Sequence, residues 1–154
     1  MYKLVGPSDI VLKTVAEPVA NFGSHWRPIL DSMLMTMHVH RGIGLAAPQI
    51  GLSRQVAVIQ LGLDEPVYEL FNPRLIYGLG VESMEEGCLS HPGYRAVKNR
   101  YRVVSISYQT FRGKKKYLTA EGLLAKAVLH EMDHLKGKTI YVRDNKRELK
   151  EGSS

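Results

Sequence analysis

The pentapeptide His130-Glu131-Met132-Asp133-His134 constrains the fold of this chain more than any other feature. On an α-helix its two histidines lie one turn apart on the same face, so both imidazoles can reach one metal ion. Leu123 and Ala127 precede them at the same helical spacing, which predicts an apolar surface beside the metal. Glu131 points away from the two histidines, where its carboxylate can act on a water molecule as a general base. The segment therefore predicts a helix that carries a metal site.

The third protein ligand of such a site is left open by the pentapeptide. One class of zinc protease continues the pattern as His-x-x-Gly-x-x-His, but Ile140 stands where the last histidine is needed. Glu148 or Glu151 would supply a carboxylate, as in another class of zinc endopeptidase, and Cys88 would supply a thiolate. A thiolate and two imidazoles with an open position for water can hold iron, zinc, nickel or cobalt.

Size and composition bound the class of protein. The chain has 154 residues, of which 44% are hydrophobic and 23% charged, as is usual for one globular domain. We expect a single domain over residues 1–150 and a frayed tail at 151–154. Cys88 is the single cysteine, so an intramolecular disulfide is excluded. Neither a signal peptide nor a membrane-spanning segment is evident, so we expect a cytoplasmic protein without membrane contact.

The charge is positive but does not by itself assign a function. Lysine and arginine number 21 against 15 aspartates and glutamates, and the formal net charge is +6. The basic residues gather at 112–116 and 136–150. A soluble surface with a positive excess accounts for this, and the alternative is an anionic partner such as RNA or a ribosome. No known nucleic-acid-binding motif is present.

The hydrophobic pattern predicts two helices. Residues 25–40 carry apolar side chains at helical spacing, with Ser24 as the N-cap and Pro28 in the first turn. A second helix is expected from a cap at Thr119 to Leu135, stopped by Gly137.

Strand-like runs lie between these two helices, and residues 1–23 read as irregular. Turns are expected at Asn72-Pro73 and Arg112-Gly113. Because strands and helices do not alternate, we expect an α+β fold, with mostly antiparallel strands around the C-terminal metal-binding helix and one N-terminal amphipathic helix. The strand-like runs are 55–61, 67–71, 75–77, 102–110 and 116–118.

Three segments together resemble the motifs of the peptide deformylase family. They are 42–49 (Gly-Ile-Gly-Leu-Ala-Ala-Pro-Gln), 86–90 (Glu-Gly-Cys-Leu-Ser) and the pentapeptide at 130–134. They agree with the family in identity, order and approximate spacing, and the resemblance extends from the first helix to about residue 142. It implies that Cys88, His130 and His134 bind one divalent metal ion, natively Fe²⁺ in many members and replaceable by Zn²⁺, Ni²⁺ or Co²⁺.

The resemblance also implies a reaction. A metal-bound water attacks the formyl group on the N-terminal formylmethionine of a nascent polypeptide, and formate is released. Glu131 takes the proton from the water and returns it to the leaving amine. The side-chain amide of Gln49 and the backbone N–H of Leu89 stabilise the oxyanion. The runner-up is a zinc endopeptidase, and a non-catalytic binding module is disfavoured because none of these residues has been lost.

Substrate binding is implied in the same way. The backbone of residues 43–45 would pair with the peptide like an added strand, and Arg95 would lie near the peptide beyond the methionine. Glu86 and Arg100 match a buried acid–base pair, and Asp133 would orient a neighbouring group. The implied substrate-binding residues are Ile43, Gly44, Leu45, Met84, Glu86, Arg95, Leu123 and Ala127.

Some residues depart from the family pattern. Arg41 stands where an acidic residue is common, Lys126 where many members are apolar, and His91 where relatives often carry an apolar residue. The chain stops 17 residues after Gly137, where many bacterial members continue into a longer helix. The basic segment 136–150 is therefore expected to make at most a transient ribosome contact. A bacterial-type or phage-encoded origin is expected, with an organellar origin left open.

Overall fold

The computed structural model describes residues 1–138 and confirms the expected α+β class. Its five strands form one antiparallel sheet in the order β1-β2-β3-β4-β5, with two α-helices and two short 3₁₀ helices. The elements are η1 (Ile10–Lys13), α1 (Trp26–Val39), β1 (Gly44–Ala46), η2 (Ala47–Ile50), β2 (Val56–Ile59), β3 (Tyr68–Cys88), β4 (His91–Gln109), β5 (Lys115–Glu121) and α2 (Leu123–Leu135).

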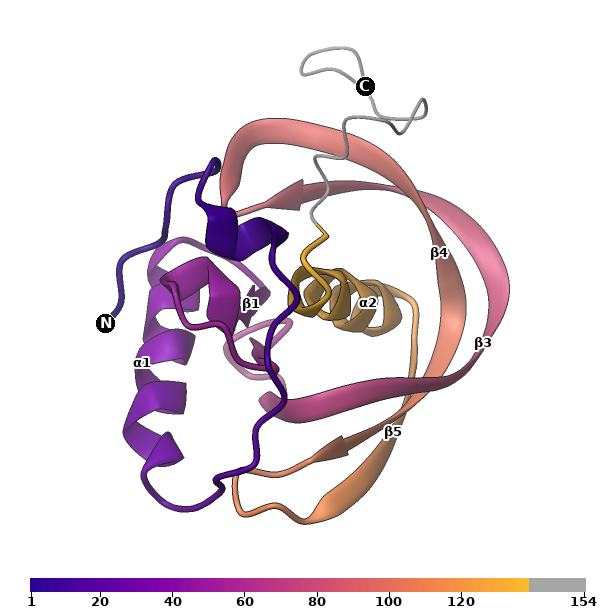
Figure 1. Ribbon diagram of the computed structural model, residues 1–154. Coiled ribbons are helices and arrows are strands. Elements are labelled where there is room, and N and C mark those ends of the chain that lie inside the picture. Colours follow the sequence, from indigo (N-terminus) through magenta and orange to yellow (C-terminus); the bar gives the residue numbers. More distant parts are fainter. Residues whose placement is uncertain (139–154) are drawn as a thin grey trace.

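The pentapeptide 130–134 lies on α2, which is the last described helix. Figure 1 shows α2 inside the curve that β3, β4 and β5 make around it. The helix packs on the sheet through Ala125, Val128 and Met132, which share an apolar cluster with Val104 and Ile106 of β4. Three of the five strands thus surround the helix that carries the histidines.

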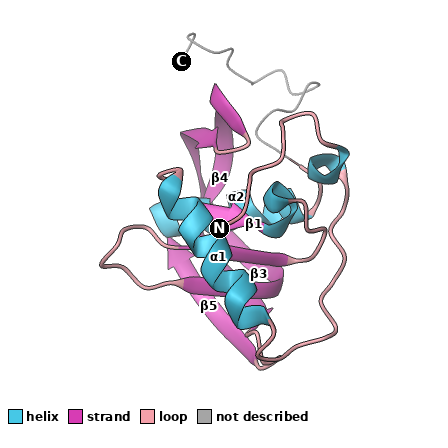
Figure 2. Ribbon diagram, turned by 90° about the vertical axis from the view of Figure 1, so that its left-hand side faces the viewer, coloured by secondary structure: helices cyan, strands magenta, loops and turns pink. Residues whose placement is uncertain are grey.

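The short strand β2 explains how the sheet joins the two helices. All four of its residues are fully buried, so it reads as a continuous apolar run rather than an alternating one. Val56 and Val58 belong to the cluster that contains Leu30 and Met33 of α1. Ile59 belongs to the cluster of α2. Helices therefore cover both faces of the sheet here, and Figure 2 shows α1 crossing in front of the strands.

The long hairpin of β3 and β4 was not expected from the sequence. Its register runs from Phe71 opposite Gln109 to Cys88 opposite His91, with only Leu89 and Ser90 between the two strands. The turn expected at Asn72-Pro73 is wrong, because β3 continues through it with a register shift between Phe71 and Arg74. Asn72 adopts a φ of 51° at this shift, and its side chain bonds the backbone N–H and C=O of Val19. The local turn signal thus marks an irregularity within a strand.

The expected helix boundaries are only partly confirmed. The cap at Thr119 is wrong: Thr119 lies in β5 opposite Ser105, and the helix begins at Leu123 after Gly122. Pairing with β4 along the whole of β5 outweighs the local capping preference. Ser24 is likewise not the N-cap of α1, because His25 holds that position without a side-chain cap. The turn at Arg112-Gly113 is confirmed by a bond from the Gly113 N–H to the Thr110 carbonyl of 2.8 Å.

The N-terminal segment is irregular apart from η1 and is tied to the rest of the molecule by backbone bonds. The Ala16 N–H donates to the carbonyl of Leu135 at 2.9 Å, and Glu17 bridges to Arg54 in parallel. The first of these bonds fastens the end of α2, and the second joins the segment to the residues just before β2. None of the described helices has the length and apolar character needed to span a membrane.

Several sequence-based expectations lie outside the described residues. They concern the tail at 151–154, most of the basic segment 136–150, Ile140, and the alternative ligands Glu148 and Glu151.

The C-terminus of α2 is closed by a backbone motif that requires glycine. The Gly137 N–H donates to the His134 carbonyl at 3.1 Å and the Lys138 N–H to the Asp133 carbonyl at 2.8 Å, which together form a Schellman motif. Gly137 has a φ of 75°, and a Cβ built there would lie 2.8 Å from the carbonyl carbon and oxygen of Lys13. Both the angle and the space exclude a side chain, so glycine stops the helix just beyond the histidines.

We predict that Gly137→Ala lowers the free energy of unfolding by about 1–3 kcal/mol, because it combines a strained φ with a backbone clash. Urea denaturation followed by circular dichroism measures the change. Gly6→Ala is the matched control, since a Cβ built at Gly6 would meet no atom within 4 Å, and its effect should stay within about 0.5 kcal/mol. Equal unfolding midpoints for the two variants would contradict this account.

Candidate active site

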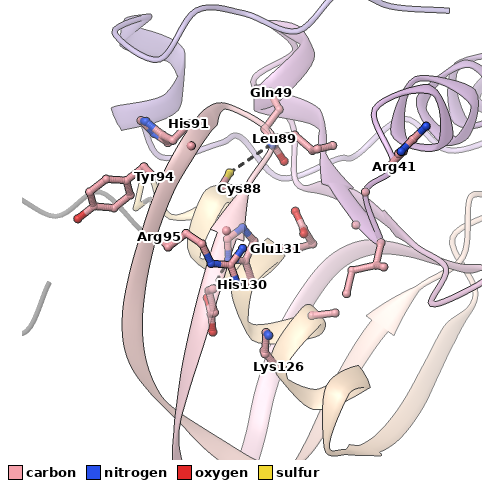
Figure 3. A pocket seen from close by; sticks show the side chains of 17 residues that line it. Arg41, Gln49, Cys88, Leu89, His91, Tyr94, Arg95, Lys126, His130 and Glu131 are labelled. Atoms are coloured by element: carbon pink, nitrogen blue, oxygen red, sulfur yellow. Dashed lines mark hydrogen bonds and ion pairs between the residues drawn. The ribbon is translucent and has the colours of Figure 1, made fainter. Parts of the chain in front are cut away.

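A pocket of about 390 Å³ opens between β1, the turn of the long hairpin and α2. Its walls carry Gly42, Ile43 and Gly44 on one side and Lys126, Ala127, His130 and Glu131 of α2 on another (Figure 3). The hairpin contributes a third wall at 86–95. All three sequence motifs therefore meet at one pocket. The lining is completed by Arg41, Gln49, Glu86, Gly87, Cys88, Leu89, His91, Gly93, Tyr94 and Arg95.

A thiol and two imidazoles converge at this pocket. One possible ligand atom from each of Cys88, His130 and His134 lies within 4.8 Å of the other two. The Cys88 Sγ is 3.2 Å from the His134 Nε2. The hairpin turn thus brings a residue 42 positions before His130 to the face of α2 that carries both histidines. The group is a donor set of the kind that binds zinc, ferrous iron, nickel or cobalt.

A buried ion pair between Glu86 and Arg100 orients the imidazole of His130. The Arg100 guanidinium of β4 donates to both carboxylate oxygens of Glu86 on β3, at 2.8 and 2.9 Å. It also donates to Asp133 of α2 at 2.6 Å. The remaining bond of Glu86 goes to the Nδ1 of His130 at 3.0 Å. Because Nδ1 is engaged with Glu86, Nε2 is the nitrogen left to face the thiol.

This network sets the charge states of its members. Burial raises the pKa of Glu86, but hydrogen bonds from Arg100 and His130 outweigh it and lower the pKa to about 2. Burial lowers the pKa of His130, while its hydrogen bonds to Cys88 and Glu86 raise it to about 10. Burial lowers the pKa of Arg100 as well, but its hydrogen bonds to Glu86 hold that pKa above the usual value. Glu86 and Arg100 therefore form a charged, mutually compensated pair in the interior, to which His130 is hydrogen-bonded. A metal ion bound at its Nε2 would take the place of a proton there.

Glu131 lies on the pocket side of α2 in a different environment. Its side chain is buried, its Oε1 has no hydrogen-bond partner among residues 1–138, and burial raises its pKa to about 7. The backbone of Gly44 approaches this carboxylate so closely that a Cβ there would lie 2.4 Å from the Glu131 Oε2. A carboxyl group with a pKa near neutrality is suited to both accept and return a proton. Glycine at position 44 is what leaves room for it.

His134 is buried deeper than His130. Burial and the nearby charge of His130 lower its pKa well below the usual value, so the imidazole is neutral. Its Nδ1 has no hydrogen-bond partner in the described part of the chain. A neutral imidazole is the form that binds a metal ion.

Gln49 lies in η2, and its side-chain amide reaches the hairpin turn that carries Cys88. The Ala46 N–H donates to its Oε1 at 2.9 Å, which fixes the amide so that its Nε2 points to the hairpin turn. The Nε2 lies 3.0 Å from the Ser90 Oγ. It lies 3.7 Å from the Cys88 Sγ, a contact drawn as a dashed line in Figure 3. Leu89 lies beside it in the pocket wall and packs over Gly42, where a Cβ would meet it at 2.6 Å. The expected donors are thus gathered on one side of the thiol.

The expected substrate-binding residues are not all brought together. Leu45 is fully buried in the cluster of α1, so only its backbone faces the pocket side of the sheet. Met84 is half-buried on β3 opposite Lys98, and Leu123 at the start of α2 is 44% exposed. These three do not line the described pocket, whereas Ile43, Gly44, Glu86, Arg95 and Ala127 do.

Sequence reasoning also gave no role to several residues in or beside the pocket. Ser90 belongs to the second motif, and its contact with Gln49 needs the hairpin geometry to be seen. Tyr94 and Gly93 follow the turn and line the pocket wall. Arg41, His91 and Lys126 were noted as departures from the family pattern, and all three lie in the lining.

We predict that Arg100→Leu lowers the free energy of unfolding by about 3–5 kcal/mol, because it leaves the buried carboxylate of Glu86 without its main partner. Urea denaturation measures the loss. Arg95→Leu is the matched control on the same strand: its pair with Glu85 is 50% and 41% exposed, and its loss should stay below about 1 kcal/mol. Similar losses in the two variants would show that the buried network is not a special support of the fold.

Comparison with known proteins places the chain in a family. A family profile described as polypeptide deformylase matches residues 1–150. A peptide deformylase from Thermoanaerobacter pseudethanolicus is 43% identical over 129 residues, which cover 84% of this chain and 80% of that protein. Peptide deformylase 1 of Bacillus anthracis is 43% identical over 135 residues, which cover 88% of this chain and 86% of that protein.

Solved structures agree in fold. A peptide deformylase from Synechococcus elongatus in complex with actinonin matches with a TM-score of 0.87 and 39% identity, over 94% of this chain and 80% of that one. The peptide deformylase of Thermotoga maritima matches with a TM-score of 0.86 and 34% identity, over 91% of this chain and 95% of that one. From the match over nearly its whole length and from these identities, the chain belongs to the polypeptide deformylase family and is an enzyme of that type.

Proposed function

We propose that this enzyme removes the formyl group from the N-terminal formylmethionine of nascent polypeptides, with Cys88, His130 and His134 as the ligands of one divalent metal ion. The family assignment supports the removal of N-formyl groups from nascent peptides. The single observation that carries the site assignment is the convergence of the thiol and both imidazoles beside the buried carboxylate of Glu131. Such a reaction belongs in the cytoplasm, where nascent chains emerge.

The residues present fit a metal ion. Peptide deformylases are metalloenzymes, and the cluster offers a soft thiolate and two imidazoles from rigid elements. His130 is oriented by Glu86, as metal-binding imidazoles usually are by a carboxylate or carbonyl. Cys88 is the proposed third ligand, supported by its place beside both histidines; the alternatives Glu148 and Glu151 lie outside the described residues. Fe²⁺ is the proposed native ion, with Zn²⁺, Ni²⁺ and Co²⁺ as substitutes.

The metal, when bound, would lower the pKa of a water molecule to near 7 and polarise the formyl oxygen. Glu131 is placed to take a proton from the attacking water and to return it to the amine that leaves. Its buried, partly protonated state suits both steps. The Gln49 Nε2, already aimed at the thiol, and the backbone N–H of Leu89 would donate to the oxyanion.

Peptide binding is proposed along β1. This strand is an edge strand of the described sheet, which is the position where an extended peptide can be added as a further strand. Gly44 keeps the strand close to Glu131. The methionine side chain would occupy the pocket between Ile43 and Ala127, with Arg95 near the peptide beyond it. Met84 and Leu123 would contribute only if they move toward the pocket on binding.

We predict that enzyme prepared without oxygen, or loaded with nickel, releases formate from a formyl-methionyl tripeptide and that a chelator stops the release. Oxygen is excluded because a thiolate bound to ferrous iron is sensitive to oxidation. Glu131→Ala should lower kcat by about 10²–10⁴-fold, the usual contribution of a general base, while one metal ion per chain is retained. Metal content by mass spectrometry and formate release by a coupled dehydrogenase assay give the two readouts.

Glu121→Ala, at an exposed position on β5, is the control for Glu131→Ala and should keep full activity. Undiminished turnover in Glu131→Ala would remove Glu131 as the base. No formate from a fully metallated wild-type sample would count against deformylation itself.

We predict that Cys88→Ser weakens metal binding or changes its selectivity, because a neutral hydroxyl replaces a thiolate ligand. Dialysis against a competing chelator followed by metal analysis measures the retained metal. His91→Gln is the matched control: His91 lines the pocket but does not belong to the three-residue cluster. It should keep one metal ion per chain, and equal retention by Cys88→Ser would exclude the thiolate ligand.

A further inference from the structure

The charges around the pocket are not balanced. Besides its histidines, three lysine or arginine side chains line it, those of Arg41, Arg95 and Lys126. Arg95 is neutralised by Glu85 at 2.7 Å. Among residues 1–138, neither Arg41 nor Lys126 forms an ion pair, and the Lys126 Nζ bonds only the backbone carbonyl of Glu85 at 3.3 Å. Two positive charges at the pocket therefore lack a carboxylate partner in the described chain.

The acidic residues of the pocket do not offset these two charges. The carboxylate of Glu86 already bonds Arg100 and His130 in the interior. Glu131 is buried beside Gly44. Both carboxylates thus lie in the depth of the site, whereas Arg41 is exposed and Lys126 is half-buried.

Arg41 and Lys126 flank the proposed path of the peptide. Arg41 comes directly before the segment 42–44 that lines the pocket, and Lys126 lies one turn before His130 on α2. Figure 3 shows the two side chains on different sides of the pocket, away from His91 and Tyr94. A peptide paired with the outer edge of β1 would carry its residues after the methionine past these cations.

The backbone at Arg41 gives an independent reason to assign it a role. The Arg41 N–H bonds the His38 carbonyl at 3.0 Å and the Gly42 N–H bonds the Met37 carbonyl at 2.9 Å, so α1 ends in the same motif as α2. Arg41 has a φ of 58°, a position where the motif prefers glycine. Gly137 fills the equivalent position after α2. An arginine kept in this strained conformation points to a function of its side chain.

We propose that Arg41 and Lys126 give this enzyme a preference for formylated peptides with an acidic side chain at the second or third residue. The inference rests on the proposed deformylase function. An aspartate or glutamate in the peptide would meet two cations that lack carboxylate partners in the described chain, and the attraction would be screened by salt. Because the contact forms on binding and is unchanged in the reaction, it should lower KM and leave kcat nearly constant.

The test uses matched peptide pairs with amidated C-termini, so that the terminal carboxylate adds no charge. Formyl-Met-Asp-Val-amide is compared with formyl-Met-Asn-Val-amide, and formyl-Met-Ala-Asp-amide with formyl-Met-Ala-Asn-amide. In at least one pair we expect kcat/KM for the aspartate peptide to be higher by about threefold or more at low salt. The ratio should fall toward one in 0.5 M salt.

Variants identify the source of the preference. Arg41→Gln and Lys126→Gln should each reduce the aspartate-to-asparagine ratio, and the double variant should bring it close to one. Lys116→Gln removes an exposed cation of β5 outside the pocket and should leave the ratio unchanged. Arg41→Gly should lose the preference while its melting temperature stays equal or rises, because glycine relieves the strained φ.

The outcomes separate this proposal from the proposed function. Hydrolysis of the asparagine peptides reports the deformylase activity alone. If these peptides are hydrolysed and both ratios are one at low salt, the acidic preference is wrong and the function stands. An aspartate preference that survives the double variant would also overturn the assignment to Arg41 and Lys126. Failure on all four peptides with metallated enzyme would overturn the function, and the preference with it.

Discussion

The site depends on one buried guanidinium. Arg100 of β4 binds Glu86 of β3 through two bonds and Asp133 of α2 through a third. It thereby joins both strands of the long hairpin to the helix that they surround. Glu86 in turn bonds the Nδ1 of His130, so the orientation of that imidazole follows from the position of two strands. An isolated carboxylate would be expensive to bury at this depth, and the fold keeps it charged only because Arg100 is there.

A second constraint is the narrow space between α2 and the edge of the sheet. β1 is an edge strand of the described sheet, and its residue Gly44 lines the pocket together with residues of α2. Gly44 of β1 lies against the Glu131 carboxylate, where any side chain would collide with it. The N–H of Ala46, on the same strand, holds the Gln49 amide. One short strand therefore sets the distance between the proposed peptide edge, the carboxylate and the amide.

The chemistry of the site was easier to predict from the sequence than its framework. The spacing of His130 and His134 is local, so a single helix is enough to place both on one face. Cys88 was one of several possible third ligands from the residues alone, and the family resemblance singled it out. The structure brings it to His134. The network of Arg100 joins three elements, and its link to His130 through Glu86 becomes visible only when β3, β4 and α2 are placed together.

The errors at the level of secondary structure share a physical cause. Thr119 and Asn72 each give a strong local signal, for a helix cap and for a turn, yet both lie in strands. In each case partners distant in sequence outweigh the local signal. Thr119 pairs with Ser105 of β4, and Asn72, at the register shift of β3, bonds the carbonyl of Gln55 and the backbone of Val19. Met84 and Leu123 were expected in the methionine pocket but do not line it. Their positions are set by the long hairpin and by the start of α2 at Leu123, neither of which the sequence pattern predicted. Periodicity indicates which side chains share a face, but not where a strand ends.

The polar groups of the site are satisfied unequally, and the inequality follows the proposed chemistry. Glu86 and Arg100, which support the site, have hydrogen bonds to charged partners at 3.0 Å or less. Glu131 and His134, which would face the metal and the substrate, each keep a buried atom without a hydrogen-bond partner in the described chain. Such an atom costs about 1–3 kcal/mol. The supporting network stabilises the fold around these two groups, so their polar atoms can be kept for a ligand rather than for the protein itself.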